Sequence, residues 1–157
     1  MIFNNQDIDN NYLKKLDKIY FGMGCFWGAE RVFWSSEGVY TTFVGYAGGD
    51  LPNPTYEDVC TGNTGHAEIV QVIYDKAFIK LNDLLKIFWE SHDPTQINGQ
   101  GNDFGTQYRS AIYTSNQNDL KEIKQSKIKF QNILKDFGFG EVQTEISILN
   151  FFYLAEN

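Results

Sequence analysis

Cys25 is the first residue in this sequence whose type and setting could carry out a reaction. It lies in Gly22-Met23-Gly24-Cys25-Phe26-Trp27-Gly28, between a strand-like segment and the start of a helix-like one. The unpaired N–H groups and the positive dipole end of a helix N-terminus stabilise an anion, so this position favours the thiolate form of Cys25. A thiolate is a nucleophile, and Phe26 and Trp27 would give it an apolar wall. The alternative is an inert cysteine in a strand-to-helix turn, because free cysteines are commonly buried.

Glu68 is a candidate proton donor. It lies in Gly65-His66-Ala67-Glu68, where the chain enters an apolar run at 69–74. Burial raises the pKa of a carboxyl group, which would let Glu68 donate a proton near neutral pH. The alternative is a solvated glutamate at a strand end. His66 could act as a base for Cys25, but we favour a structural, hydrogen-bonded histidine.

Further candidates lie in two long segments rich in Gly, Asn, Asp and Pro, at 48–65 and 92–108. Irregular segments of this length are usually functional or mobile. The first contains Tyr56 and the second contains Asp103 and Tyr108, whose hydroxyl and carboxylate groups could bind a small polar substrate or simply belong to ordinary turns.

The two cysteines and two histidines stand at positions 25, 60, 66 and 92, without the close pairing typical of a metal site. We therefore expect no metal. Cys60 could resolve an oxidised Cys25 or be a passive small residue, and we favour the passive interpretation.

The elements that must position these residues alternate between strand and helix patterns, which predicts one α/β or α+β domain over 1–157, with 1–17 as a polar N-terminal extension. Residues 67–74 form a nearly continuous apolar run, typical of a central strand buried on both faces. Asn116 is a plausible N-cap for a helix that ends near Asp136. Predicted strands are 19–22, 39–46, 67–74, 110–114 and 143–149; predicted helices follow Gly24 and cover 81–91 and 117–136.

Composition excludes several classes of protein. Thirteen Lys and Arg against 20 Asp and Glu give a net charge of −7, and no basic cluster is present, which argues against sequence-independent binding to nucleic acid or an anionic membrane. Two cysteines are too few for a disulfide scaffold. The sequence has no apolar run typical of a signal peptide or membrane span, so we expect a cytoplasmic protein.

The chemistry-bearing segments together resemble the methionine sulfoxide reductase A family, in order and spacing, over about 19–156. The matching blocks are Gly24-Cys25-Phe26-Trp27-Gly28, Gly45-Tyr46-Ala47-Gly48-Gly49, Asn53-Pro54-Thr55-Tyr56, Gly65-His66-Ala67-Glu68, Phe88-Trp89-Glu90, His92-Asp93-Pro94-Thr95 and Gly101-Asn102-Asp103 through Ser110.

The resemblance implies a two-layer fold, with a mixed sheet, flanking helices and long irregular loops, and it implies an activity. The family reduces the S-epimer of free or protein-bound methionine sulfoxide and repairs oxidised methionine without a metal or prosthetic group. Cys25 would attack the sulfoxide sulfur and become a sulfenic acid. Glu68, Tyr56 and Tyr108 match the groups that bind and protonate the sulfoxide oxygen.

The resemblance also implies substrate contacts and a reductant. Phe26 and Trp27 match the residues that hold the terminal methyl group of the substrate, and Asp103 matches a residue that positions substrate or solvent. Thioredoxin, glutaredoxin or a small thiol would restore the enzyme, which we expect to be a monomer.

The sequence departs from the family at Gly99, where Arg is common, and at Leu154, where Pro is common. Relatives usually continue beyond the position of Asn157 through a segment that often holds resolving cysteines, and Cys60 matches a position that is not their usual resolving residue. Either the parent chain is longer or an external thiol is used, so the resolving cysteine stays unassigned.

Two other functions fit parts of the pattern. A cysteine protease or acyltransferase would also place Cys beside an aromatic residue at a helix start, with His as the base, but its Cys-Gly-Ser-Cys-Trp pattern is missing. A peptide- or methionine-binding module with an inert Cys25 would explain the aromatic residues but not the thiol at a helix start beside an acid.

Overall fold

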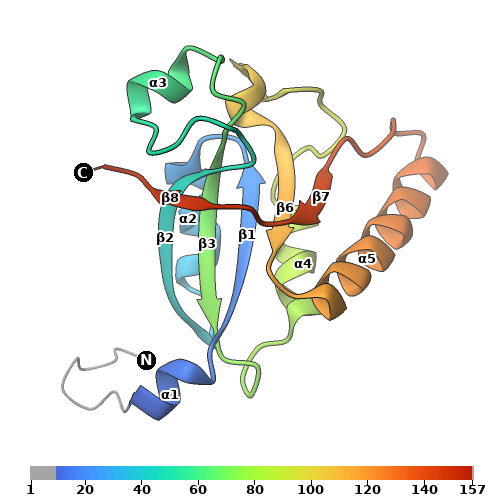
Figure 1. Ribbon diagram of the computed structural model, residues 1–157. Coiled ribbons are helices and arrows are strands. Elements are labelled where there is room, and N and C mark those ends of the chain that lie inside the picture. The colour runs from blue at the N-terminus through green and yellow to red at the C-terminus, as the bar shows by residue number, and fades with distance from the viewer. Residues whose placement is uncertain (1–9, 157) are drawn as a thin grey trace.

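The computed structural model describes residues 10–156 and shows a mixed α/β architecture, as expected (Figure 1). The helices are α1 (Asn10–Lys14), α2 (Phe26–Trp34), α3 (Tyr56–Cys60), α4 (Leu81–Glu90) and α5 (Gln117–Asp136), with a 3-10 turn, η1, at Thr106–Tyr108. The strands are β1 (Asp17–Met23), β2 (Val39–Ala47), β3 (Ala67–Tyr74), β4 (Gly99–Gln100), β5 (Asp103–Phe104), β6 (Ser110–Thr114), β7 (Glu145–Ile148) and β8 (Phe152–Leu154).

Six strands form one curled sheet in the order β7-β6-β1-β3-β2-β8, and β4 and β5 form a separate hairpin. All neighbours in the large sheet are antiparallel except β6 and β7, which are parallel. Strand β3 lies between β1 and β2, and seven of its eight residues are buried. The prediction of a central strand with both faces covered is therefore confirmed.

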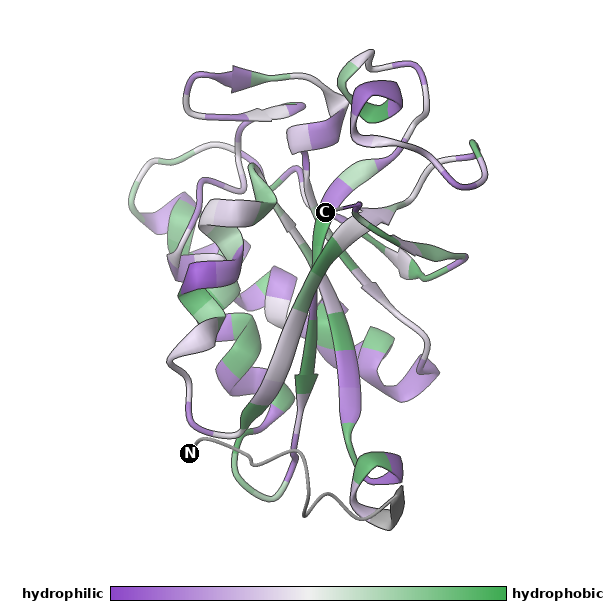
Figure 2. Cartoon of the chain, turned by 90° about the vertical axis from the view of Figure 1, so that its left-hand side faces the viewer, coloured by the Kyte–Doolittle hydropathy of each residue, from purple (hydrophilic) through white to green (hydrophobic). Residues whose placement is uncertain are grey.

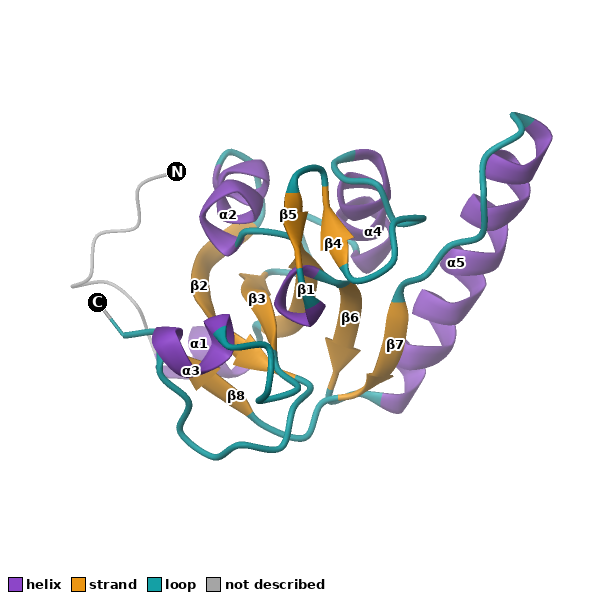
Figure 3. Cartoon of the chain, turned by 90° about the horizontal axis from the view of Figure 1, so that it is seen from above, coloured by secondary structure: helices purple, strands orange, loops and turns teal. Residues whose placement is uncertain are grey.

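The main core lies between one face of the sheet and helices α2 and α4, which Figure 3 shows on the same side of the strands. Figure 2 shows hydrophobic residues, in green, along the central strands. Fully buried Phe21 of β1 stacks on Phe33 of α2 and on Phe88 of α4, with ring centroids 5.1 and 4.9 Å apart. Buried Ile123 extends this core to α5. Helical spacing of apolar residues explains why these helices have one buried side.

The opposite face of the sheet has a smaller core, covered by the chain that crosses from β7 at one edge to β8 at the other (Figure 1). Phe152 of β8 packs on Tyr20 of β1 at a centroid distance of 5.3 Å. The C-terminal strand therefore closes the sheet on the side away from α2.

Helix α5 begins where the sequence predicts. The side-chain oxygen of Asn116 accepts hydrogen bonds from the backbone N–H groups of Asn118 and Asp119. The helical pattern places Ile133 on the same side as Ile123, but the Ile133 side chain is 52% exposed whereas Ile123 is buried. Ile133 borders a groove lined by residues of α4 and α5.

The long segments expected to be irregular contain short elements instead: α3 in the first, and the β4–β5 hairpin and η1 in the second. They are too short for a periodic pattern. Helix α3 is fixed by a capping box, in which Thr55 and Asp58 each accept a hydrogen bond from the other's backbone N–H. Of the polar N-terminal segment 1–17, residues 1–9 lie outside the described part, and the remainder contains α1 and the start of β1. Within residues 10–156, no helix is long and apolar enough to cross a membrane.

Candidate active site

Cys25 lies at the N-cap of α2, as expected for a nucleophile at a helix start. Its carbonyl accepts the first helical hydrogen bond from the N–H of Ala29, while the exposed thiol makes no capping hydrogen bond within the described chain. Gly24 turns the chain into the helix with φ +93°, and a Cβ at this position would come within 2.8 Å of the Gln100 side chain. The β4–β5 hairpin therefore lies directly against the loop that presents the thiol, and the alternative of a buried cysteine is wrong.

Glu68 lies beside Cys25 in an opposite environment. Its side chain is 2% exposed, and Oε1 accepts a hydrogen bond of 3.3 Å from the N–H of Phe26, the residue that follows Cys25. Oε2 is buried and has no hydrogen-bond partner among the described residues. Burial raises the pKa of Glu68 to about 7, opposed by the Phe26 N–H and reinforced by the charge of Asp103. The carboxyl group can therefore hold and release a proton near neutral pH. The alternative of a solvated glutamate at a strand end is wrong.

Two tyrosines supply further donors near Glu68. A hydrogen bond with the Cys60 thiol is the main cause that raises the pKa of Tyr56 to about 12. Burial raises the pKa of Tyr108, and the charges of Glu68, Cys60, Asp103 and Cys25 add to this effect, in that order. Both phenols therefore stay protonated and can donate hydrogen bonds. The electrostatic influence of four other site residues on Tyr108 shows that the segments predicted to act together do meet.

Phe26 and Trp27 differ in exposure, although they are adjacent. Phe26 is buried at 2% exposed, and Trp27 is 58% exposed, with the two rings edge to face at 5.3 Å. Buried Tyr46 contacts the other side of the Phe26 ring at 5.8 Å. Trp27 is therefore the apolar surface open to a ligand, while Phe26 supports it. Asp103, in β5, is exposed at the rim of the site.

Neither histidine is free to act as a base for Cys25. His66 is 2% exposed; its Nδ1 accepts a hydrogen bond from the Gly49 N–H, so Nε2 donates to the Leu51 carbonyl at 2.7 Å. The structural role favoured for His66 is confirmed. His92 contacts the Phe88 carbonyl and the Ser110 hydroxyl, and burial lowers its pKa to about 4. A cysteine-protease mechanism would lack its base.

Cys60 ends α3 and is an exposed free thiol. Its hydrogen bond with Tyr56 places it at the site. Among residues 10–156, no group of three or more His, Cys, Asp and Glu side chains is placed to hold a metal ion.

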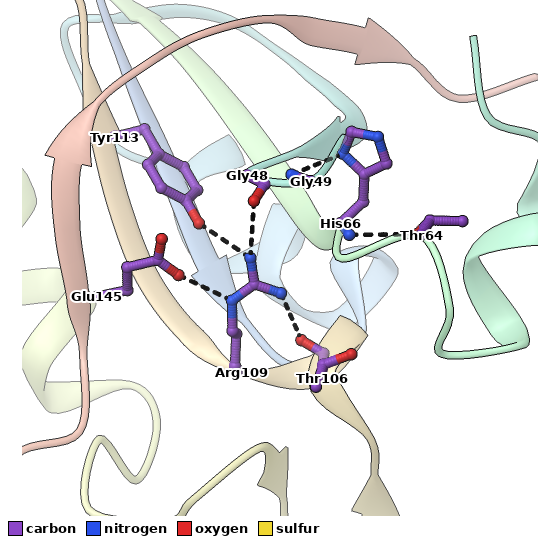
Figure 4. Close-up of polar contacts among 8 residues, drawn as sticks. All are labelled: Gly48, Gly49, Thr64, His66, Thr106, Arg109, Tyr113 and Glu145. Carbon is purple, nitrogen blue, oxygen red and sulfur yellow. Dashed lines mark hydrogen bonds and ion pairs between the residues drawn. The ribbon is translucent and has the colours of Figure 1, made fainter. Parts of the chain in front are cut away.

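Arg109 joins the loops around the site, a role that the sequence does not disclose (Figure 4). Its guanidinium donates to the Thr106 carbonyl in η1, to Glu145 in β7, to the Tyr113 hydroxyl in β6 and to the Gly48 carbonyl after β2, at 2.9, 2.9, 3.2 and 3.5 Å. Its position next to Tyr108 was the only sign in the sequence that Arg109 lies near the site. Tyr46 and Glu156 were also missed: burial and the charges of Glu156 and Glu68 raise the pKa of Tyr46, whose hydroxyl has no partner within the described chain.

Comparison with known proteins gives a consistent result. The sequence model of the family described as peptide methionine sulfoxide reductase matches residues 17–157. The peptide methionine sulfoxide reductase MsrA of Salinispora arenicola is 59% identical over 137 residues, which are 87% of this chain and 62% of that protein. The chain thus spans less than two thirds of the length of this relative.

Solved structures agree with the sequence comparison. Methionine sulfoxide reductase A of Corynebacterium diphtheriae superposes with a TM-score of 0.87 at 45% identity, covering 90% of this chain and 71% of that one. Mxr1 from Saccharomyces cerevisiae, in a complex with Trx2, has a TM-score of 0.66 at 26% identity, covering 95% and 85%. The chain belongs to the peptide methionine sulfoxide reductase family, in the group named MsrA.

Proposed function

We propose that this chain reduces the S-epimer of methionine sulfoxide, free or within proteins, to methionine. The observation that carries the proposal is an exposed thiol at a helix start beside a buried carboxyl whose pKa is about 7. The Phe26 N–H connects them, because it follows Cys25 in the chain and donates to Glu68. Sulfoxide reduction needs both groups, since the sulfur is a poor electrophile until its oxygen is protonated or hydrogen-bonded.

In the first step the Cys25 thiolate attacks the sulfoxide sulfur, and Glu68 gives its proton to the oxygen. Tyr56 and Tyr108 donate hydrogen bonds to the same oxygen as its negative charge grows. The oxygen passes to Cys25, so the products are methionine and a cysteine sulfenic acid. Trp27, supported by Phe26, holds the methyl group of the substrate, and Asp103 positions substrate or solvent at the rim.

In the second step an external thiol attacks the sulfenic acid of Cys25, which releases water and leaves a mixed disulfide. Another thiol then reduces this disulfide. The complex of yeast Mxr1 with Trx2 supports a thioredoxin as the source of these thiols. Such a cycle needs no bound cofactor and suits a single domain in a reducing cytoplasm. Glutaredoxin or a small thiol is the alternative reductant.

The test is turnover of the separated S- and R-epimers of N-acetylmethionine sulfoxide with dithiothreitol. The wild-type protein should reduce only the S-epimer, Cys25→Ser should have no activity, and the matched Cys60→Ser variant should keep it. Normal turnover by Cys25→Ser, or equal use of both epimers, would contradict the proposal.

A further inference from the structure

The last described residues reach the helix that carries Tyr56. Strand β8 pairs with β2, and the N–H of Ala155 donates to the Val44 carbonyl at 3.0 Å, extending the pairing by one residue. Glu156 follows directly, and its Oε1 accepts a hydrogen bond of 2.5 Å from the backbone N–H of Tyr56. The contact joins residues 100 positions apart in the chain.

The approach of β8 is tightly defined. A Cβ at Gly45 would lie 2.3 Å from the Tyr153 carbonyl oxygen and 2.7 Å from the Phe152 ring, so only glycine permits this distance between the strands. Phe152 is also held by its contact with Tyr20. The backbone that precedes Glu156 is therefore anchored on two sides.

The Tyr56 N–H is one of the donors that a helix start leaves without an internal partner. The capping box satisfies the N–H groups of Thr55 and Asp58, and the Val59 N–H donates to the Thr55 carbonyl. Glu156 supplies the acceptor for Tyr56. Helix α3 has only five residues and Tyr56 is 47% exposed, so the tie to Glu156 adds to the few contacts that hold this residue, which are the capping box and the hydrogen bond with Cys60.

An electrostatic effect also relates Glu156 to the site. Its charge acts on the fully buried Tyr46, which contacts the Phe26 ring and is paired in register with Glu68 across β2 and β3. The Glu156 carboxylate thus joins the C-terminal strand to the start of α3, and its charge reaches Tyr46 behind Phe26.

We propose that Glu156 is a positioning residue for Tyr56: its carboxylate ties the first turn of α3 to the β2–β8 pair and thereby aims the Tyr56 phenol at the sulfoxide oxygen. This inference rests on the proposed function. Because the phenol matters most when negative charge builds on the oxygen, loss of the tie should lower the rate of reduction more than substrate binding.

The experiment is a double-mutant cycle with single-turnover rates on the S-epimer. Glu156→Ala should reduce the saturating rate about fivefold, with little change in the half-saturating concentration. Glu156→Gln, whose amide oxygen still accepts the hydrogen bond, should stay within about twofold of wild type. In a Tyr56→Phe background, Glu156→Ala should cause little further loss, since both changes remove the same interaction.

Glu141→Ala is the matched control, because Glu141 is an exposed glutamate in the loop before β7. It should behave as wild type. A wild-type rate in Glu156→Ala, or an undiminished fivefold loss in the Tyr56→Phe background, would overturn the positioning role.

Hydrogen exchange at the Tyr56 amide separates this inference from the proposed function. Glu156→Ala should speed that exchange, whatever the activity of the protein, and unchanged exchange would contradict the tie. Wild-type protein that reduces neither epimer would defeat the proposed function, while the exchange result would still report on the contact.

Discussion

Cys25 and Glu68 are close neighbours held in opposite environments. The thiol is exposed at the start of α2, and the carboxyl is 2% exposed, where a negative charge is disfavoured. One residue is thus prepared to give electrons and the other to give a proton. The backbone N–H of Phe26, the residue that follows Cys25, donates to Glu68 and links the two.

The pKa of Glu68 leads to a pH prediction. It is raised to about 7, so the protonated form, which is the acid in the proposed reaction, is lost as the pH rises through about 7. The single-turnover rate of sulfoxide reduction should fall over that range. Glu68→Gln should lower the rate about 100-fold at pH 6 and remove this dependence, as expected for loss of a general acid.

Glu90→Gln is a suitable control for this measurement, because Glu90 is an exposed glutamate at the end of α4. Its rate and pH profile should match wild type. An unchanged rate in Glu68→Gln would remove Glu68 from the role of proton donor.

Local sequence identified some site residues and not others. Cys25 and Glu68 could be found because each stands at the end of an element with a clear pattern. Glu156 could not, since its partner lies 100 residues away and only the pairing of β8 with β2 brings them together. Tyr46 looked like any aromatic strand residue, and its burial beside Phe26 depends on tertiary packing.

At the scale of elements, the loop before α2 depends on Gly24. This residue has φ +93° and lies against Gln100, so an alanine there meets both backbone strain and a steric clash. We expect Gly24→Ala to lower the free energy of unfolding by about 2 kcal/mol. Urea denaturation measures this change.

Gly28, four residues after Gly24 and without a positive φ, is the matched control. It lies inside α2 with no atom within 4 Å of an added Cβ. Gly28→Ala should therefore raise the free energy of unfolding by about 0.5–1 kcal/mol, because alanine is the better helix former. Equal effects of the two substitutions would contradict the account of this loop.

Arg109 is the second residue on which the arrangement of elements depends. Arg109→Lys keeps the charge but cannot reproduce contacts to Thr106, Glu145, Tyr113 and Gly48 from one planar group. We expect a loss of about 2 kcal/mol in the free energy of unfolding. Arg31→Lys, at an exposed position on α2, should change it by less than about 0.5 kcal/mol. A neutral Arg109→Lys would show that the loops are held by other contacts.

The predicted elements agree with the structure where the pattern of apolar residues is clear. The strand at 110–114 and the helix at 117–136 agree with β6 and α5, and 67–74 agrees with β3. Helix α3 was missed because its five residues are too few to show a helical period. The β4–β5 hairpin was missed because each of its strands has only two residues, too few to show alternation. These short elements are fixed by capping side chains and by contacts with distant segments.

At the scale of the whole molecule, the order of strands could not be predicted. Strand β8 lies beside β2 and β7 beside β6, so the last two strands occupy opposite edges of the sheet. That arrangement brings the C-terminal segment to the active site. The net charge of −7 gives the molecule no overall positive charge that would attract a polyanion.

The measurement that tests the central claim most directly is the oxidation state of the two cysteines after one turnover without reductant. The protein is incubated with the S-epimer of a methionine sulfoxide, and both cysteines are mapped by mass spectrometry with a sulfenic-acid trap. We predict one trapped sulfenic acid per chain on Cys25, one equivalent of methionine and an unmodified Cys60. Methionine formed with Cys25 unmodified, or a Cys25–Cys60 disulfide as the main product, would contradict the account.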